Sequence, residues 1–230
     1  MTTSRTRIAV VAILLTVSMA AFSQDGFPGG APSRSVIKSQ EKADSYFAKG
    51  EFGKAMSIYR DDLASVGDKY SQYMIGYMYL AGKGVQEDAI VASAWYRLAA
   101  QRENAQYVRI CDGLLALFND EQLSRSDQLY IGLRRDMGDL MLVQRQVRED
   151  IQILRRRTAS ELFLQVEMKR GSSRYQRDEF DEAVTRMESL LEFLARRMAL
   201  ESTLDDSEKE GLTTMIRDAE RAVDAHKVSR

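Results

Sequence analysis

The side chains best suited to nucleophilic or general-base chemistry are Cys111 and His226, because the 230 residues contain one cysteine and one histidine. His226 lies near the C-terminus, where a chain frays. Cys111 shares a helical face with Val108, Leu115 and Phe118, and a cysteine on an apolar face behaves as a small hydrophobe. We therefore expect a buried, unreactive thiol. An intermolecular disulfide is the alternative for an odd cysteine.

Carboxylates are frequent, with 34 Asp and Glu residues, but they are spread along charged segments without a distinctive constellation. The sequence contains no glycine-rich phosphate loop, no metal-spaced cluster and no nucleophile elbow. We therefore predict a protein that is not an enzyme, with no catalytic residue, no metal site, no cofactor and no small-molecule substrate.

The chain shows instead the spacing of a helix–loop–helix unit between residues 71 and 100. Ile75 and Tyr79 lie four apart on a predicted first helix. Gly82 and Gly84 end that helix, because glycine tolerates positive φ in a tight connection. Such a unit buries its apolar face only by stacking on neighbours, which predicts a binding scaffold.

The second helix of this unit is predicted to start at Asp88, which can cap it. Its apolar face has residues at spacings of three and four: Ala92, Trp95 and Ala99. Small alanines beside the large Trp95 allow two helices to interdigitate, and Gly76 allows a close approach because it has no Cβ. We expect Trp95 and Tyr79 to be core residues.

These residues resemble the Sel1-like repeat, a relative of the tetratricopeptide repeat. The family positions that the chain keeps are Gln72, Gly76, Tyr79, Gly82, Gly84, Val85, Asp88, Ala92, Trp95, Ala99 and Ala100. Ser71 replaces an alanine of the family pattern, and Ile75 replaces a leucine. The resemblance covers about one unit, and it implies a helical-repeat fold that binds proteins, with no catalytic residues to carry over.

Weaker copies flank the complete unit. Ala55, Ile58 and Tyr59 repeat the second-helix pattern 37 positions earlier, and residues 105–107 repeat residues 71–73 at an offset of 34. No Gly-x-Gly-Val follows the later copy. The sequence therefore predicts an all-α protein with a short Sel1-like or tetratricopeptide-like α-solenoid over residues 40–118.

Partners of such scaffolds commonly bind the concave surface that the first helices line. On the first helix of the complete unit, Ile75, Gly76 and Tyr79 are assigned to packing. The remaining candidates for partner binding are Tyr73, Met74, Tyr77 and Met78, together with Tyr46 upstream. Packing against the neighbouring unit is the alternative role for some of the four residues on the first helix. Tyrosine and methionine are common at contact surfaces.

The N-terminus has the pattern of a secretory signal peptide. Arg5 and Arg7 precede a short apolar run, and small residues follow up to Ser23. We predict removal of residues 1–23, a flexible linker over residues 24–39, and a periplasmic or secreted protein. The alternative is an uncleaved segment that anchors the chain in the inner membrane.

The charge balance gives no reason to expect nucleic acid, because the net charge of −1 becomes −3 once Arg5 and Arg7 are removed. Arginine clusters occur at 134–135, 155–157 and 196–197. A surface for acidic partners is one interpretation, but nearby acidic residues favour solvated helix faces.

The second half, residues 119–230, is predicted to form a long-helix, coiled-coil-like module that starts at a capping box of Asn119 and Gln122. One long helix follows, with an apolar stripe of Leu129, Leu133, Met137, Leu140, Val143, Val147, Ile151, Leu154, Thr158 and Leu162. Two more helices have stripes of Val184, Met187, Leu191, Leu194 and Met198, and of Leu212, Met215 (or Ile216), Ala219 and Val223. We expect a helical hairpin or three-helix bundle, with a self-associating coiled coil as the alternative.

These observations favour a non-catalytic exported adaptor or scaffold that binds another cell-envelope protein through the Sel1-like repeat surface. The alternative is a structural module that forms a homo-oligomer through its C-terminal helices. A hydrolase acting on the cell wall is disfavoured, because the catalytic set is missing.

Overall fold

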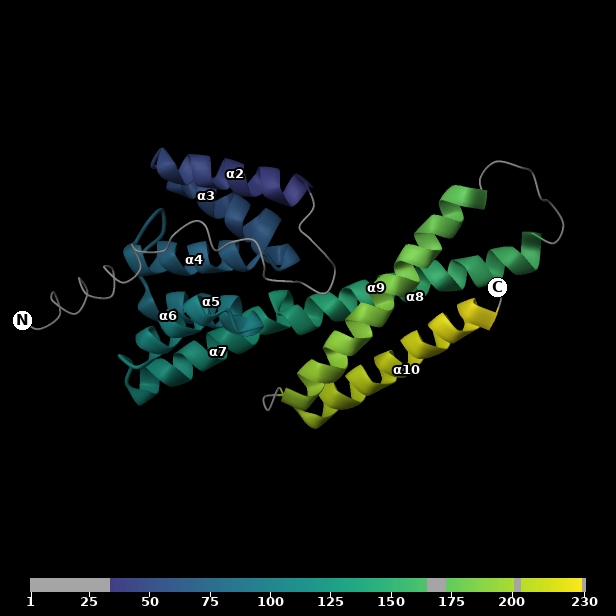
Figure 1. The fold of residues 1–230 in the computed structure, drawn as a ribbon. Helices are drawn as coiled ribbons and strands as arrows, with labels where there is room; N and C mark the ends of the chain where they lie inside the picture. Colours follow the sequence, from purple (N-terminus) through teal and green to yellow (C-terminus); the bar gives the residue numbers. More distant parts are fainter. Residues whose placement is uncertain (1–33, 165–172, 201–203, 229–230) are drawn as a thin grey trace, which may run out of the picture. The chain divides into compact units, whose positions relative to one another are not determined.

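The computed structural model describes residues 34–164, 173–200 and 204–228, which are helical apart from short connections (Figure 1). No strand occurs among these residues, which confirms the all-α prediction. The chain divides into two compact units, and the boundary between them falls between Met141 and Leu142. The predicted signal peptide and residues 24–33 of the predicted linker lie outside the described residues.

The first unit opens with α2 (Arg34–Ala48), so part of the predicted linker is helical. A turn at Gly50, with φ of +77°, leads into α3 (Phe52–Ser57), which continues as η2 (Ile58–Leu63) and η3 (Ala64–Val66). These elements pack on α2 through fully buried side chains: Ala43, Ala55 and Tyr59.

The segment that carries the complete repeat pattern forms α4 (Lys69–Ala81) and α5 (Ala89–Ala99), followed by η4 (Ala100–Arg102). The Asp88 carboxylate accepts hydrogen bonds from the backbone N–H groups of Ile90 and Val91 at 2.9 and 3.0 Å, which confirms the predicted cap. Gly82 and Gly84 have φ of +61° and +73°, so the predicted glycine turn is also confirmed.

Two of the glycines are needed for packing as well. A Cβ on Gly76 would lie 2.7 Å from Cε1 of Tyr96, so α4 and α5 approach too closely for any side chain there. A Cβ on Gly84 would lie 2.6 Å from Cβ of Phe52, so this loop rests on the start of α3. Trp95 is 5% exposed and packs in the hydrophobic core of the first unit, as predicted.

The last pair of helices in this unit is α6 (Ala105–Leu115) and α7 (Asp120–Met137), and both pack against α5. The predicted capping box of Asn119 and Gln122 starts α7. The buried hydroxyls of Ser93 and Ser126 lie 2.7 Å apart and join α5 to α7. The first unit therefore continues to Met141, beyond residue 118 where the sequence places the end of the repeat module.

The prediction of one long helix after Asn119 is wrong, because Gly138 interrupts it. Gly138 has extended backbone, with ψ of 151°, and a Cβ there would lie 2.5 Å from the carbonyl oxygen of Arg134. The apolar stripe is also interrupted, since Leu129 is 41% exposed while Val143 and Val147 are fully buried.

The second unit contains α8 (Asp139–Leu164) from Leu142 onward, α9 (Ser173–Leu200) and α10 (Asp206–Val228). The predicted stripe of α10 is buried. On α9, Val184, Met187 and Leu194 are buried as predicted, whereas Leu190 is buried in place of Leu191, which is half-buried. The capping box at the start of α10 joins Asp205 to Glu208.

Contacts within the second unit connect its helices in sequence. Arg186 of α9 binds the fully buried carboxylate of Asp150 on α8, with Nε 3.0 Å from Oδ2. Lys227 of α10 lies 2.8 Å from Glu188 of α9. The C-terminal helices therefore fold back on one another within one chain.

Candidate partner-binding surface

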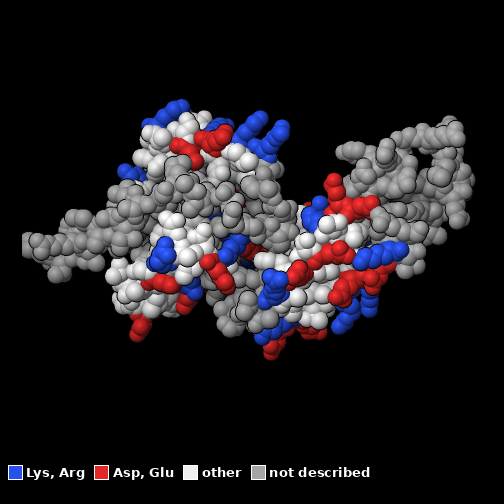
Figure 2. Space-filling view, in the orientation of Figure 1, with Lys and Arg blue, Asp and Glu red and all other residues white. Residues whose placement is uncertain are grey.

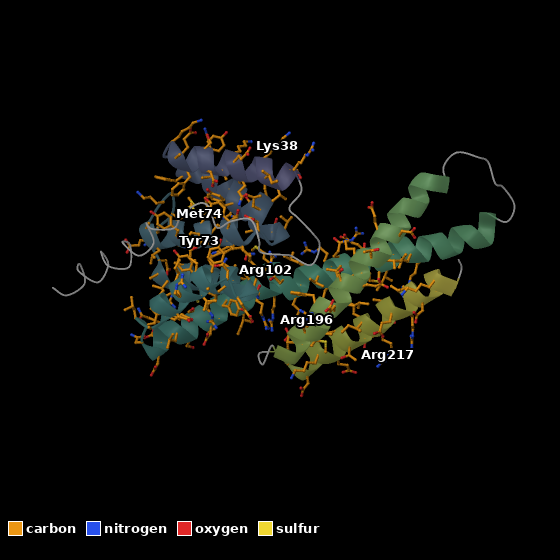
Figure 3. All side chains as sticks on the ribbon, viewed as in Figure 1. Lys38, Tyr73, Met74, Arg102, Arg196 and Arg217 are labelled. Atoms are coloured by element: carbon orange, nitrogen blue, oxygen red, sulfur yellow. The ribbon has the colours of Figure 1, made fainter. Side chains whose placement is uncertain are left out.

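The five residues predicted to bind a partner divide into two groups. Tyr73 is 3% exposed and Met78 is fully buried, so the prediction that they offer a binding surface is wrong. Both lie in the core because α4 is enclosed by α5 on one side and by neighbouring helices on others. Tyr46, Met74 and Tyr77 are half-buried and keep part of their surface in solvent. Tyr73 and Met74 are labelled on α4 in Figure 3.

Tyr73 belongs to a cluster of tyrosines that joins three helices. Its ring stacks on Tyr107 of α6 at a centroid distance of 5.3 Å and lies 5.5 Å from Tyr96 of α5. Burial raises the pKa of Tyr73 to about 12. The Tyr96 hydroxyl is buried and has no hydrogen-bond partner among the described residues. This cluster packs α4, α5 and α6 together.

A second group of rings remains partly exposed where α2, α3 and α4 meet. The Phe47 ring lies 5.2 Å from Phe52 and 6.0 Å from Tyr77. We call Tyr46, Phe47, Phe52, Met74 and Tyr77 the aromatic surface, and all five are half-buried. The sequence pattern alone missed Phe47 and Phe52, although both flank the turn at Gly50.

Two lysines lie over rings of the aromatic surface. Lys54 Nζ is 5.2 Å from the centroid of Tyr46, and Lys83 Nζ is 5.2 Å from that of Phe52. Cations at this distance are attracted by the ring quadrupole. Lys54 is also paired with the carboxylate of Glu51, so the net positive charge at the edge of the surface comes from Lys83.

Asp44 fixes α2 to the elements that follow it. Its carboxylate accepts hydrogen bonds from the hydroxyls of Tyr59 and Tyr70, the latter at 3.0 Å. Burial, together with Asp44, raises the pKa of Tyr59 far above its ordinary value. Both tyrosines therefore stay protonated and donate to Asp44, which holds the helix that carries Tyr46 and Phe47.

A buried ion pair lies at the other end of α4. Lys69 Nζ is 3.0 Å from Oδ1 of Asp139, and both side chains are 1% exposed. Arg102 (Figure 3) donates to both carboxylate oxygens of Asp139 at 3.0 Å. Burial alone would raise the pKa of Asp139, but Lys69 and Arg102 outweigh it and hold that pKa below its ordinary value.

Polar neighbours complete the coordination of this ion pair. Lys69 donates to the side-chain oxygens of Gln72 and Gln101 at 3.0 and 3.2 Å and to the carbonyl of Leu98 at 2.9 Å. Gln101 also accepts from the backbone N–H of Asp139 at 3.1 Å. A buried pair with this many partners is structural, and it joins α4 and η4 to the first residue of α8. Of these residues, Gln72 alone belongs to a pattern visible in the sequence, the repeat pattern.

Cys111 and the acidic side chains are the described groups that could act as a nucleophile or bind a metal. Cys111 is 5% exposed, and burial raises the pKa of its thiol to about 11, so the thiolate that reacts is scarce at neutral pH. The prediction of a buried cysteine is thus confirmed. No group of three His, Cys, Asp or Glu side chains within the described part could hold a metal ion. The side chain of His226 lies outside that part.

The described members of the arginine clusters differ in their surroundings. Arg134 is buried at 7% exposure while Arg135 is exposed, and Arg196 pairs with Glu192 one turn away on α9. Figure 2 shows basic and acidic side chains interleaved along the second unit. The side chains of Arg156, Arg157 and Arg197 lie outside the described residues.

Comparison of the chain with protein-family models, with curated proteins and with solved structures gave no match. Among the described helices, none combines the length and the apolar character that crossing a membrane requires.

Proposed function

We propose that this chain is a non-catalytic adaptor that binds another protein through the aromatic surface of a Sel1-like helical repeat. The observation that carries the proposal is the partial exposure of five large side chains on α2, α3 and α4, three of which are linked by ring contacts of 5.2 and 6.0 Å. Aromatic side chains and methionine are enriched at the buried centres of protein interfaces.

The arrangement of helices supports the repeat interpretation. In the first unit α2 packs with α3 and α4 packs with α5, and α5 contacts both of the helices that follow it, α6 and α7 (Figure 1). Pairs that contact their neighbours in this way are typical of α-solenoids. Asp44 and the turn at Gly50 fix the elements that carry the aromatic surface, and the exposed side of that surface stays available for a partner.

The partner is expected to present apolar side chains beside a carboxylate, because Lys83 lies over the ring of Phe52, whereas Lys54 is already paired with Glu51. We also propose that residues 1–23 are a signal peptide and that the mature protein works in the cell envelope. Mass spectrometry of the protein from its native host tests this export, and a mature form that starts at Met1 or Thr2 would contradict it.

Site-specific photocrosslinking tests the adaptor function. A photoreactive residue at position 77 or 46 should give adducts with the same protein, whereas one at the exposed Ile131 of α7 should not. Tyr77→Ala should then weaken binding of the purified partner, with Ile131→Ala as the matched control. Thermal melts of both variants separate loss of binding from loss of fold. Adducts that form at position 131 alone would place the surface elsewhere.

Self-association through the C-terminal helices remains the second candidate function. The internal contacts of α8, α9 and α10 use much of the predicted apolar stripes, because Val184, Met187, Leu212 and Met215 are buried within one chain. This observation makes the adaptor function the stronger proposal.

A further inference from the structure

One side of α7 carries an apolar residue, a glycine and two opposite charges in a line. Arg125, Leu129, Gly132 and Asp136 follow one another at spacings of four, three and four, which places them on one face of the helix. All four are exposed, and Leu129 is 41% exposed. A Cβ on Gly132 would meet no atom within 4 Å, so the face is open there.

The packing of the chain itself does not explain this face. The side chains of Arg125 and Asp136 make no hydrogen bond or ion pair with any other described residue. Glycine within a helix destabilises the helix relative to alanine. Gly76 compensates for this cost through the close approach of Tyr96, but nothing described approaches Gly132.

We propose that this face binds the same face of a second copy of the chain, with the two α7 helices antiparallel. In an antiparallel pair related by a two-fold axis, Leu129 of one copy meets Gly132 of the other. The same register places Arg125 against Asp136, and symmetry makes each contact occur twice. Leu129 is then a knob, and the missing side chain of Gly132 provides the space for it.

Charge decides the direction of the two helices. In a parallel pair around the same face, Arg125 would face Arg125, and Asp136 would face Asp136, which is unfavourable. In the antiparallel pair both charges meet their opposite. The sequence of this face is therefore complementary to itself in one orientation alone.

The contact is small, because it uses one face of a single helix. We therefore expect a weak dimer that forms as the protein concentration rises. Its ion pairs lie at the surface, so added salt should weaken it further.

Reversal and exchange of the two charges test the proposal on the full mature chain by analytical ultracentrifugation over a concentration series. Arg125→Glu places a carboxylate against Asp136 of the partner subunit and should weaken the dimer about tenfold or more. Asp136→Arg should do the same. The double variant, which exchanges the two charges, should restore dimerisation. Thermal melts should be alike for all variants, because both side chains are exposed.

Three results would overturn the proposal: a wild-type chain that stays monomeric at every concentration, a single reversal that dimerises like wild type, or a double variant that does not recover. Cysteine crosslinking checks the register. A mixture of Leu129→Cys and Gly132→Cys chains should give more of the mixed disulfide than random pairing would. A product ratio at the random value would also count against the antiparallel register. The native Cys111 does not compete, because it is buried.

Discussion

At the scale of single residues, glycines with the same helical backbone have opposite roles in this protein. A Cβ on Gly76 would lie only 2.7 Å from Cε1 of Tyr96 and 3.2 Å from the carbonyl oxygen of Ala92, whereas a Cβ on Gly113 of α6 would meet no atom within 4 Å. The first glycine is required by the contact between α4 and α5. Gly113 makes the unfolded chain more flexible than alanine would, and no contact in the folded protein requires a glycine there.

We predict opposite effects of alanine at these two positions. Gly76→Ala should lower the free energy of unfolding by about 1–3 kcal/mol, because the new methyl group overpacks the contact with Tyr96. Gly113→Ala should raise it by about 0.5–1 kcal/mol, because alanine favours the helix and fits the open space. Urea denaturation followed by circular dichroism measures both. Equal effects of the two changes would contradict the close approach at Gly76.

The buried carboxylate of Asp139 gives a pH dependence with a definite sign. Its pKa in the folded protein lies below the ordinary value of 3.8, so the unfolded chain binds the proton more readily. The stability that Asp139 contributes is therefore fully present well above the unfolded-state pKa of about 3.9, and it is lost as the pH falls below that value through the lower pKa of the folded protein. Asp139→Asn leaves Lys69 and Arg102 buried without a counter-charge and should cost about 3–5 kcal/mol at neutral pH.

The difference in free energy of unfolding between wild type and Asp139→Asn should accordingly shrink in acid. Urea denaturation at a series of pH values measures this difference. Asp136→Asn is the matched control, since Asp136 is exposed and only three residues away, and it should change stability little at any pH. A difference for Asp139→Asn that stayed constant down to about pH 3 would show that its charge is not stabilised by the two cations.

At the scale of elements, the break between α7 and α8 decides how the first unit ends. Gly138 turns the backbone away from the helical path, and the next residue, Asp139, then reaches Lys69 and Arg102. Asp139 is the first residue of α8, and the N-terminal end of a helix also stabilises a carboxylate. The break at Gly138 is therefore what allows Asp139 to form the buried ion pair.

Substitution of Gly138 by alanine tests whether the helix is broken at this residue or continuous. Gly138→Ala would place a Cβ 2.5 Å from the Arg134 carbonyl oxygen and should destabilise the first unit by about 1–3 kcal/mol. In a continuous helix the same change would increase stability, since alanine is the better helix former. Denaturation monitored by the fluorescence of Trp95, the one tryptophan, reports on this unit. An increase in stability would contradict the break.

At the scale of the whole molecule, the two compact units are separate cores in one chain. The first needs α7, because Tyr130, Leu133 and Met137 pack against the core that contains Trp95. The second has its own buried residues on α8, α9 and α10. The division after Met141 is therefore a division between hydrophobic cores.

Truncation of the chain tests where the first unit ends. A fragment of residues 24–141 should unfold cooperatively, because it keeps α7 and the partners of Asp139. A fragment of residues 24–118 should lose the cooperative transition, because it exposes the side of α5 that carries Ser93 and leaves Lys69 buried without Asp139. Thermal melts followed by Trp95 fluorescence compare the two. A cooperative melt of the shorter fragment would place the boundary at residue 118.

Much of the fold could be predicted because it depends on local rules. Spacings of three and four residues identified helices, and Asp88, Asn119 and the glycines at 82 and 84 marked their ends, since caps and positive φ are properties of short segments. The burial of Trp95 and Cys111 followed from their place on apolar faces. These features depend on residues within about one helical turn along the chain.

The tertiary structure alone decided which apolar and charged residues meet. Tyr73 and Tyr77 look alike in the sequence, yet Tyr73 is buried because α6 brings Tyr107 onto its ring, while Tyr77 stays half-exposed. Lys69 and Asp139 are separated by most of the first unit, and only the packing of α4 beside the end of α7 pairs them. Burial and ion pairing depend on residues distant in the chain, which helical periodicity does not specify.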